Sequence, residues 1–117
     1  MSLAGKRILV VEDEFIVAAM IGDILEDEGA QVIGPAGTLA EGLDLGGGET
    51  LDAAVLDWNL GGEPGAPVAR LLRQRGVPFV IATGYGAVQA EFADITVLSK
   101  PYRPDALVDE LVRLTTG

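Results

Sequence analysis

Short apolar segments alternate along this chain with segments of helical periodicity. Five of them have the length and the residue types of buried β-strands: Lys6–Val11, Gln31–Gly34, Ala53–Asp57, Val77–Ala82 and Thr96–Ser99. Their apolar residues follow one another directly instead of alternating with polar ones, which is typical of parallel strands covered on both faces. The longest wholly apolar run, Phe15–Ile21, holds seven residues, so no membrane span or secretory signal fits. A cytoplasmic protein is therefore expected.

The segments between these strands carry helix signals. The apolar residues of the first follow one face of a helix: Val17, Ile21, Ile24 and Leu25. The Thr38–Glu41 capping box predicts the start of a second helix, which we expect Gly46–Gly48 to end. A third helix carries Leu71 and Leu72, and Pro104 opens the last.

The weakest helix prediction falls between the fourth and fifth strands. Two glycines, Gly84 and Gly86, disfavour a helix at the start of the stretch Gly84–Asp94, so only Ala87–Phe92 is expected to be helical. The glycine-rich segment Gly61–Gly65 is predicted to be a loop.

Strands that alternate with helices predict an α/β fold, a doubly wound parallel sheet with helices on both faces. The 117 residues form one expected domain, with a core of about residues 6–115 and with residues 1–3 as a possible cloning remnant. No output domain is expected in this chain, because the last helix ends close to its final residue.

Composition excludes several kinds of site. The chain has no cysteine and no histidine, so it cannot form disulfides, thiolate zinc sites or a serine–histidine triad. The formal net charge is −10, and residues 1–57 hold twelve of the 18 acidic residues but two of the 8 basic ones. Such a field disfavours direct contact with nucleic acid or an anionic membrane, and favours cations or a basic partner surface.

Polar side chains stand where the predicted strands end. Glu12 and Asp13 follow the first strand, Asp57 ends the third, Thr83 follows the fourth and Lys100 follows the fifth. In a doubly wound sheet the functional crevice lies beyond these carboxyl ends. We therefore expect three carboxylates, one hydroxyl and one ammonium to meet at one edge.

These residue types suit phosphoryl transfer. Close carboxylates repel one another and need protons or a cation, and oxygen-only ligands favour Mg²⁺. Lys100 and Thr83 can bind the remaining phosphoryl oxygens. Asp57, in the middle of the predicted edge, is the best candidate for a nucleophile that forms an acyl phosphate.

Four segments together resemble the bacterial response-regulator receiver (CheY-like) domain of two-component signalling. They are Val10-Val11-Glu12-Asp13-Glu14, Val55-Leu56-Asp57-Trp58-Asn59-Leu60, Ala82-Thr83-Gly84 and Ser99-Lys100-Pro101-Tyr102. The resemblance covers the chain from Lys6 to about Thr115. It implies a flavodoxin-like (βα)5 three-layer sandwich with strand order 2-1-3-4-5.

The resemblance also implies roles for single residues. Asp57 would accept the phosphoryl group from a sensor histidine kinase or a phosphotransfer protein, and Lys100 and Thr83 would bind that group. Mg²⁺ would be held by Glu12, Asp13, Asp57 and the backbone carbonyl of Asn59. The domain would catalyse only its own phosphorylation and dephosphorylation, and the Lys100–Pro101 peptide would be cis.

Signalling would run from the site to a downstream protein. A homodimer through the last two helices and the strand between them is a further implication. Val97 stands where many receivers carry a switching aromatic residue. The segment Phe79–Gly86 instead resembles a subgroup of receivers with a Phe-Ala-Thr-Gly-x-Tyr motif. In this chain Ile81 occupies the Phe position of that motif, and Tyr85 comes one place earlier than its Tyr. Our hypothesis is that the switch residues are Thr83, Gly84, Tyr85 and Tyr102, and that ordering of Thr83–Phe92 is the signal.

Other interpretations remain open at this point. Glu12 and Asp13 could merely favour the start of the first helix. The chain could be a receiver-like protein-binding module that works without phosphorylation. A small phosphatase with an aspartate nucleophile fits less well, because such enzymes usually carry a second acid two residues later, where this chain has Asn59.

Overall fold

The computed structural model describes residues 2–84 and 88–116. Its main strands and helices alternate along the chain as far as β6, which is followed by β7 with only a short turn between them: β1 (Arg7–Val11), α1 (Phe15–Asp27), β2 (Gln31–Ala36), α2 (Leu39–Gly48), β3 (Ala53–Asp57), α3 (Ala66–Gln74), β6 (Phe79–Thr83), β7 (Val97–Ser99) and α4 (Pro104–Thr115). Three short elements complete them: β4 (Asn59–Leu60), β5 (Glu63–Pro64) and the 3₁₀ turn η1 (Ala90–Phe92).

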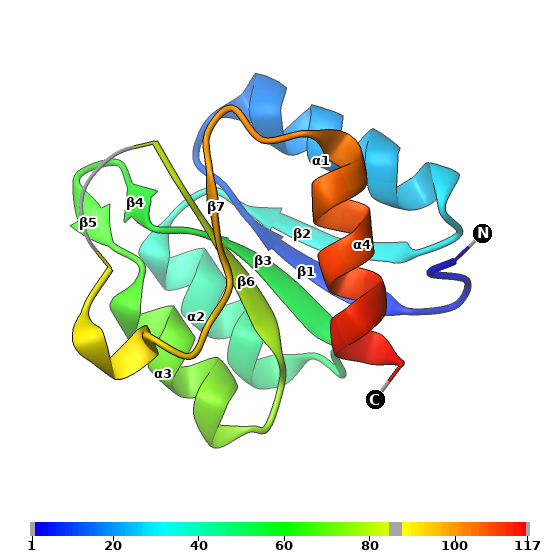
Figure 1. The fold of residues 1–117 in the computed structure, drawn as a ribbon. Helices are drawn as coiled ribbons and strands as arrows, with labels where there is room; N and C mark the ends of the chain where they lie inside the picture. Colours follow the sequence, from blue (N-terminus) through cyan, green and yellow to red (C-terminus); the bar gives the residue numbers. More distant parts are fainter. Residues whose placement is uncertain (1, 85–87, 117) are drawn as a thin grey trace.

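The five long strands form one parallel sheet in the order β2-β1-β3-β6-β7. Helices α1 and α4 cover one face, and α2 and α3 cover the other (Figure 1). This is the predicted α/β flavodoxin-like sandwich with strand order 2-1-3-4-5, which is therefore confirmed. The carboxyl ends of β1 and β3 lie side by side in the middle of the sheet.

The apolar strands bury alternate residues on the two faces. Leu9 and Val11 of β1 belong to the core beneath α2 and α3, whereas Ile8 and Val10 belong to the core beneath α1 and α4. Every residue of β3 is buried. Burial on both faces explains why the sequence shows continuous apolar runs at these strands.

The first described residues belong to the fold. Leu3 has no exposed surface and packs in the core beneath α1 and α4. Its backbone N–H donates to the carbonyl oxygen of Glu28 at 3.0 Å. The segment that the sequence suggests as a cloning remnant therefore contributes a core side chain.

Helix α2 runs through the glycines that were expected to end it. Its last residue is Gly48, and Gly46 is buried against the neighbouring helix. The guanidinium of Arg75 donates to the carbonyl oxygens of Gly46 and Glu49. Contacts with α3 therefore outweigh the low helix propensity of glycine.

The predicted helix over Ala87–Phe92 is also wrong in extent, because the described part of that stretch forms only the single turn η1; Ala87 lies outside the described residues. Phe92 is 1% exposed and lies edge-on to Trp58 and Phe79, at ring distances of 5.4 and 6.3 Å. This one aromatic anchor fixes the turn without a longer amphipathic helix.

Two ion pairs fasten the same turn to α3. Arg70 pairs with Glu91 at 2.7 Å, and Arg73 pairs with Asp94 at 2.9 Å. The guanidinium carbon of Arg73 also lies 5.3 Å from the centre of the Phe92 ring.

Two smaller differences concern loops. The segment predicted as a loop at Gly61–Gly65 contains part of the two-residue hairpin β4–β5. Strand β2 continues two residues past the predicted end at Gly34. No helix within residues 2–84 and 88–116 is both long enough and apolar enough to cross a membrane.

We expect Phe92→Ala to lower the free energy of unfolding by about 3–5 kcal/mol, because it leaves a cavity beside Trp58 and Phe79. Urea denaturation measures the change. The neighbouring exposed ion pair serves as the control, since Glu91→Gln should cost less than about 1 kcal/mol. An equal effect of both substitutions would show that the ring does not anchor the turn.

Candidate functional site

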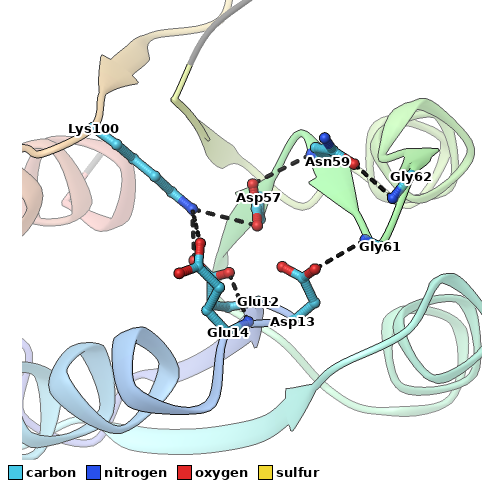
Figure 2. Close-up of polar contacts among 8 residues, drawn as sticks. All are labelled: Glu12, Asp13, Glu14, Asp57, Asn59, Gly61, Gly62 and Lys100. Atoms are coloured by element: carbon cyan, nitrogen blue, oxygen red, sulfur yellow. Dashed lines mark hydrogen bonds and ion pairs between the residues drawn. The ribbon is translucent and has the colours of Figure 1, made fainter.

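The carboxyl edge of the sheet gathers the polar residues that the sequence placed at strand ends. Glu12 and Asp13 follow β1 and Asp57 ends β3, and a ligand oxygen from each lies within 4.8 Å of the others. Lys100 reaches toward them from the end of β7 (Figure 2). Residues up to 88 positions apart in the chain therefore form one cluster.

Asp57 lies at the centre of the cluster and is only 4% exposed. One carboxylate oxygen accepts a hydrogen bond from the backbone N–H of Asn59 at 3.3 Å. The other lies 3.4 Å from Lys100 Nζ (Figure 2). The carboxylate is thus oriented from both sides.

Lys100 is placed by its backbone as well as by its side chain. Its N–H donates to the carbonyl oxygen of Thr83 at 2.8 Å, which ties the end of β7 to the end of β6. Its ammonium lies 2.9 Å from Glu12 and 3.9 Å from Glu14. The Lys100–Pro101 peptide is cis, as the family resemblance implied.

The loop after β3 closes the other side of the cluster. Asp13 accepts a hydrogen bond from the backbone N–H of Gly61 at 2.9 Å, and the Asn59 side-chain oxygen accepts one from Gly62 at 2.9 Å. Both glycines have left-handed φ values, +62° and +94°, which other residues rarely adopt. Gly61 and Gly62 were not among the predicted site residues. Two consecutive glycines in a glycine-rich loop are nevertheless a sequence signal for a turn with left-handed φ values.

A third glycine is required by close packing. A Cβ atom at Gly65 would lie 2.8 Å from the carbonyl oxygen of Asp57. The backbone of the loop therefore approaches the end of β3 as closely as only glycine permits.

The carboxyl groups have shifted proton affinities. Burial raises the pKa of Asp57, Glu12 raises it further, and the backbone N–H of Asn59 and the charge of Lys100 oppose them, with a net value of about 7. Burial also raises the pKa of Asp13, but its hydrogen bonds with Asp57, Glu12 and Gly61 outweigh this and leave it below the usual range. Close carboxyl groups that repel one another favour a protonated form of one of them when no cation neutralises their charge.

The arrangement suits a hard cation. Asp13, Asp57 and Asn59 line an open polar pocket of about 200 Å³, with Lys100 on its wall. Its ligand atoms are oxygens, and the open space leaves room for water and for a phosphoryl group. These properties fit Mg²⁺, which keeps several of its waters when it binds carboxylates.

The predicted switch residues divide into two groups. Thr83 is 9% exposed at the end of β6 and Gly84 is exposed beside the polar pocket, whereas Tyr85 lies outside the described residues. The hydroxyl of Tyr102 is buried without a hydrogen-bond partner in the described residues. Burial raises the pKa of that hydroxyl to about 12.

Sequence reasoning missed Glu14 as a site residue. Its carboxylate is exposed, lines the polar pocket and is the third carboxylate within 4 Å of Lys100 Nζ, after those of Glu12 and Asp57. Its position directly after Glu12 and Asp13 was a usable signal, but acids there also suit a helix start.

Comparison with known proteins agrees with this geometry. Residues 8–112 match the model of the response regulator receiver domain family. The transcriptional regulatory protein TcrA of Mycobacterium tuberculosis is 38% identical over 124 residues, covering 97% of this chain. The chain spans about half of that relative, 47% of its length.

Solved structures show the same relation. SdrG from Sphingomonas melonis Fr1 is 40% identical, with a TM-score of 0.82 and coverage of 97% of this chain and 98% of SdrG. The receiver domain of the sensor histidine kinase PA1611 from Pseudomonas aeruginosa PAO1 is 25% identical, with a TM-score of 0.82 and coverage of 97% and 100%. That structure has a magnesium ion coordinated in its active site cleft.

The acidic cluster at the carboxyl edge, the lysine that reaches it from β7, and the family match over most of the chain lead to one conclusion. This protein belongs to the response regulator receiver domain family of two-component signalling.

Proposed function

We propose that this receiver domain takes a phosphoryl group onto Asp57 from a phosphohistidine of a sensor kinase or phosphotransfer protein, with Mg²⁺ at the acidic cluster. The observation that carries the proposal is the position of Asp57, whose carboxylate lies within 4.8 Å of two further acidic ligands and 3.4 Å from Lys100 Nζ. Glu12 has the same two kinds of neighbour, but Asp57 lines the open polar pocket and Glu12 is not among its lining residues.

The transfer conserves atoms and charge. A carboxylate oxygen of Asp57 attacks phosphorus while the bond from phosphorus to the donor's imidazole nitrogen breaks. The electron pair of the broken bond goes to that nitrogen, and the donor ring carries a proton on its other nitrogen before transfer, so the products are an acyl phosphate on Asp57 and a neutral imidazole on the donor. Bound Mg²⁺ would neutralise the charge on the phosphoryl oxygens, and the residues that would hold it are Glu12, Asp13, Asp57 and the carbonyl of Asn59.

The remaining site residues have roles after transfer. Lys100 can meet a phosphoryl oxygen with its ammonium, since it already lies beside the accepting carboxylate. The Thr83 hydroxyl can donate to another phosphoryl oxygen from the end of β6. Slow attack of water on the acyl phosphate would then reset the domain.

The proposal extends to the output. Thr83, Gly84, Tyr85 and Tyr102 would carry the change to a downstream protein, in the manner of the subgroup with the Phe-Ala-Thr-Gly-x-Tyr motif. The exposed Val97 supports a route other than the aromatic switch of many receivers. A homodimer through α4, β7 and the segment before β7 would be compatible with this route.

The expected location is the cytoplasm, and the whole of residues 1–117 would act as one receiver domain.

Incubation with acetyl phosphate and Mg²⁺ should add one phosphoryl group to the chain, as measured by intact-protein mass spectrometry. Asp57→Asn should abolish the addition because the nucleophile is lost, and EDTA should abolish it for the unaltered chain. Equal labelling of Asp57→Asn would contradict the assignment. A chain that is never labelled would favour the binding-module interpretation.

The stability of the metal-free domain should depend on the charge of Asp57. Its pKa lies at about 7 instead of the ordinary 3.8, so the folded state holds a proton that the unfolded state has lost. The free energy of unfolding therefore falls as pH rises from about 4 to about 7. We expect Asp57→Asn to stabilise the domain by about 1–3 kcal/mol at pH 8 and by much less near pH 4.

Urea denaturation in EDTA at both pH values measures this difference. Asp44→Asn, at an exposed position on α2, is the matched control and should shift the free energy of unfolding far less. A stabilisation by Asp57→Asn that is the same at both pH values would show that the buried charge is not its cause.

Lys100→Ala should leave Mg²⁺ binding in place but weaken the response to phosphorylation, because it removes the cation that meets the phosphoryl group. Amide exchange at Thr83, Gly84 and 88–92, with and without a phosphoryl mimic on Asp57, measures that response. Arg103→Ala removes an exposed cation close by in the chain and should keep the full response. Unchanged protection in the unaltered chain would remove the ordering hypothesis itself.

A further inference from the structure

Glu14 is the most exposed of the carboxylates that pair with Lys100. Its side chain is 65% exposed, against 6% for Asp57 and 1% for Glu12. It nevertheless lines the open polar pocket, together with Asp57 and Lys100. Glu14 therefore lies at the rim, and a phosphoryl donor that enters the pocket from solvent meets its carboxylate.

The contacts of the Glu14 side chain do not give it a structural role. Glu14 is the N-cap of α1, but its side chain makes no capping hydrogen bond. The one polar contact of its carboxylate in the described residues is the ion pair with Lys100 at 3.9 Å (Figure 2). The same ammonium lies closer to Glu12 and Asp57, at 2.9 and 3.4 Å. An exposed pair at the longer distance contributes little to holding Lys100 in place.

The charge of Glu14 sets the net charge that a metal-loaded pocket presents to a donor. Four carboxylates and one ammonium form the cluster: Glu12, Asp13, Glu14, Asp57 and Lys100. When all of them are ionised and Mg²⁺ is bound, one net negative charge remains. Without the charge of Glu14, the same metal-loaded cluster would be neutral.

We infer that Glu14 is a specificity-determining residue that slows the phosphorylation of Asp57 by small dianionic donors. The inference rests on the proposed function and deepens it, because it concerns which phosphoryl donors the site accepts. A dianion is repelled by a negative rim before it can reach Lys100. A donor that brings compensating positive charge to the rim avoids this repulsion, so one repulsive group separates two classes of donor.

Acetyl phosphate and phosphoramidate are suitable probes because they differ in charge. At neutral pH acetyl phosphate is a dianion, whereas phosphoramidate has a protonated nitrogen and is mainly a monoanion. Transfer from acetyl phosphate breaks the bond from phosphorus to the acetyl oxygen and releases acetate. Transfer from phosphoramidate breaks the phosphorus–nitrogen bond and releases ammonia. In both cases the departing group keeps the electron pair, and the acyl phosphate forms on Asp57.

Glu14→Gln removes the rim charge and keeps the length of the side chain. We expect it to raise the rate constant of labelling by acetyl phosphate about three- to tenfold at low ionic strength, and that by phosphoramidate by a smaller factor. Intact-protein mass spectrometry over time, at saturating MgCl₂ for each variant, measures both rate constants. The gain with acetyl phosphate should shrink in about 0.5 M KCl, because salt screens the repulsion.

Two further variants are the controls. Glu14→Asp keeps the charge and should keep the slow rate with acetyl phosphate. Asp44→Asn removes one negative charge from an exposed position on α2, outside the cluster, and should change either rate constant by less than about twofold. Equal gains with the two donors in Glu14→Gln, or a gain that high salt leaves unchanged, would overturn the inference.

A second readout does not depend on phosphoryl transfer. Inorganic phosphate is an unreactive anion, and the amide NMR signals of Gly61 and Gly62 at the pocket report its binding to the Mg²⁺-loaded chain. Its dissociation constant should fall about three- to tenfold in Glu14→Gln and stay unchanged in Asp44→Asn. An affinity for phosphate that Glu14→Gln leaves unaltered would contradict the repulsion at the rim.

The outcomes separate this inference from the proposed function. If neither the unaltered chain nor Glu14→Gln is labelled by either donor, the proposed function fails and the inference fails with it. If both are labelled at equal rates by acetyl phosphate, the proposed function stands and the role of Glu14 is overturned.

Discussion

The structure depends on one partly buried ammonium among carboxylates. Lys100 lies within 4 Å of Glu12, Glu14 and Asp57, and it is the only basic side chain paired with the cluster in the described residues. Without it, the acids after β1 and β3 would repel one another at an edge where burial already opposes their ionisation. Because one ammonium faces several carboxylates, the pocket has an excess of negative charge that strongly favours a divalent cation.

The sheet order makes this arrangement possible. Strands β1 and β3 are neighbours, so the acids that follow them are adjacent, and β6 separates β3 from β7. Lys100 spans that gap with its long side chain, while its backbone bond to Thr83 fixes its starting point. Residues 8–112, which match the receiver family, include all of these residues, and Thr83 lies at the junction between β6 and Lys100.

A second set of contacts joins the site to the surface beside β6. Trp58 follows Asp57 directly, and its ring meets that of Phe92 in η1. Arg70 and Arg73 fasten the same turn to α3. A change at Asp57 therefore has a short path of packed side chains to a segment that lacks the long helix expected there.

The residues at the strand ends, and the sheet that gathers them, could be predicted from the sequence because their causes are local. Apolar runs of strand length and helical stripes specify a doubly wound sheet, and in such a sheet the residue after each strand must lie at one edge. Asp13, Asp57, Thr83 and Lys100 are found there, and Glu12 is found close by.

The extent of α2 and of η1 was decided instead by tertiary contacts, because Arg75 supports a glycine-rich helix end and Phe92 anchors a single turn. Glu12 and Asp13 are adjacent in sequence and alike in charge, so only the folded structure could distinguish their environments. Glu12 faces the ammonium of Lys100, a residue 88 positions away, whereas Asp13 faces the open pocket.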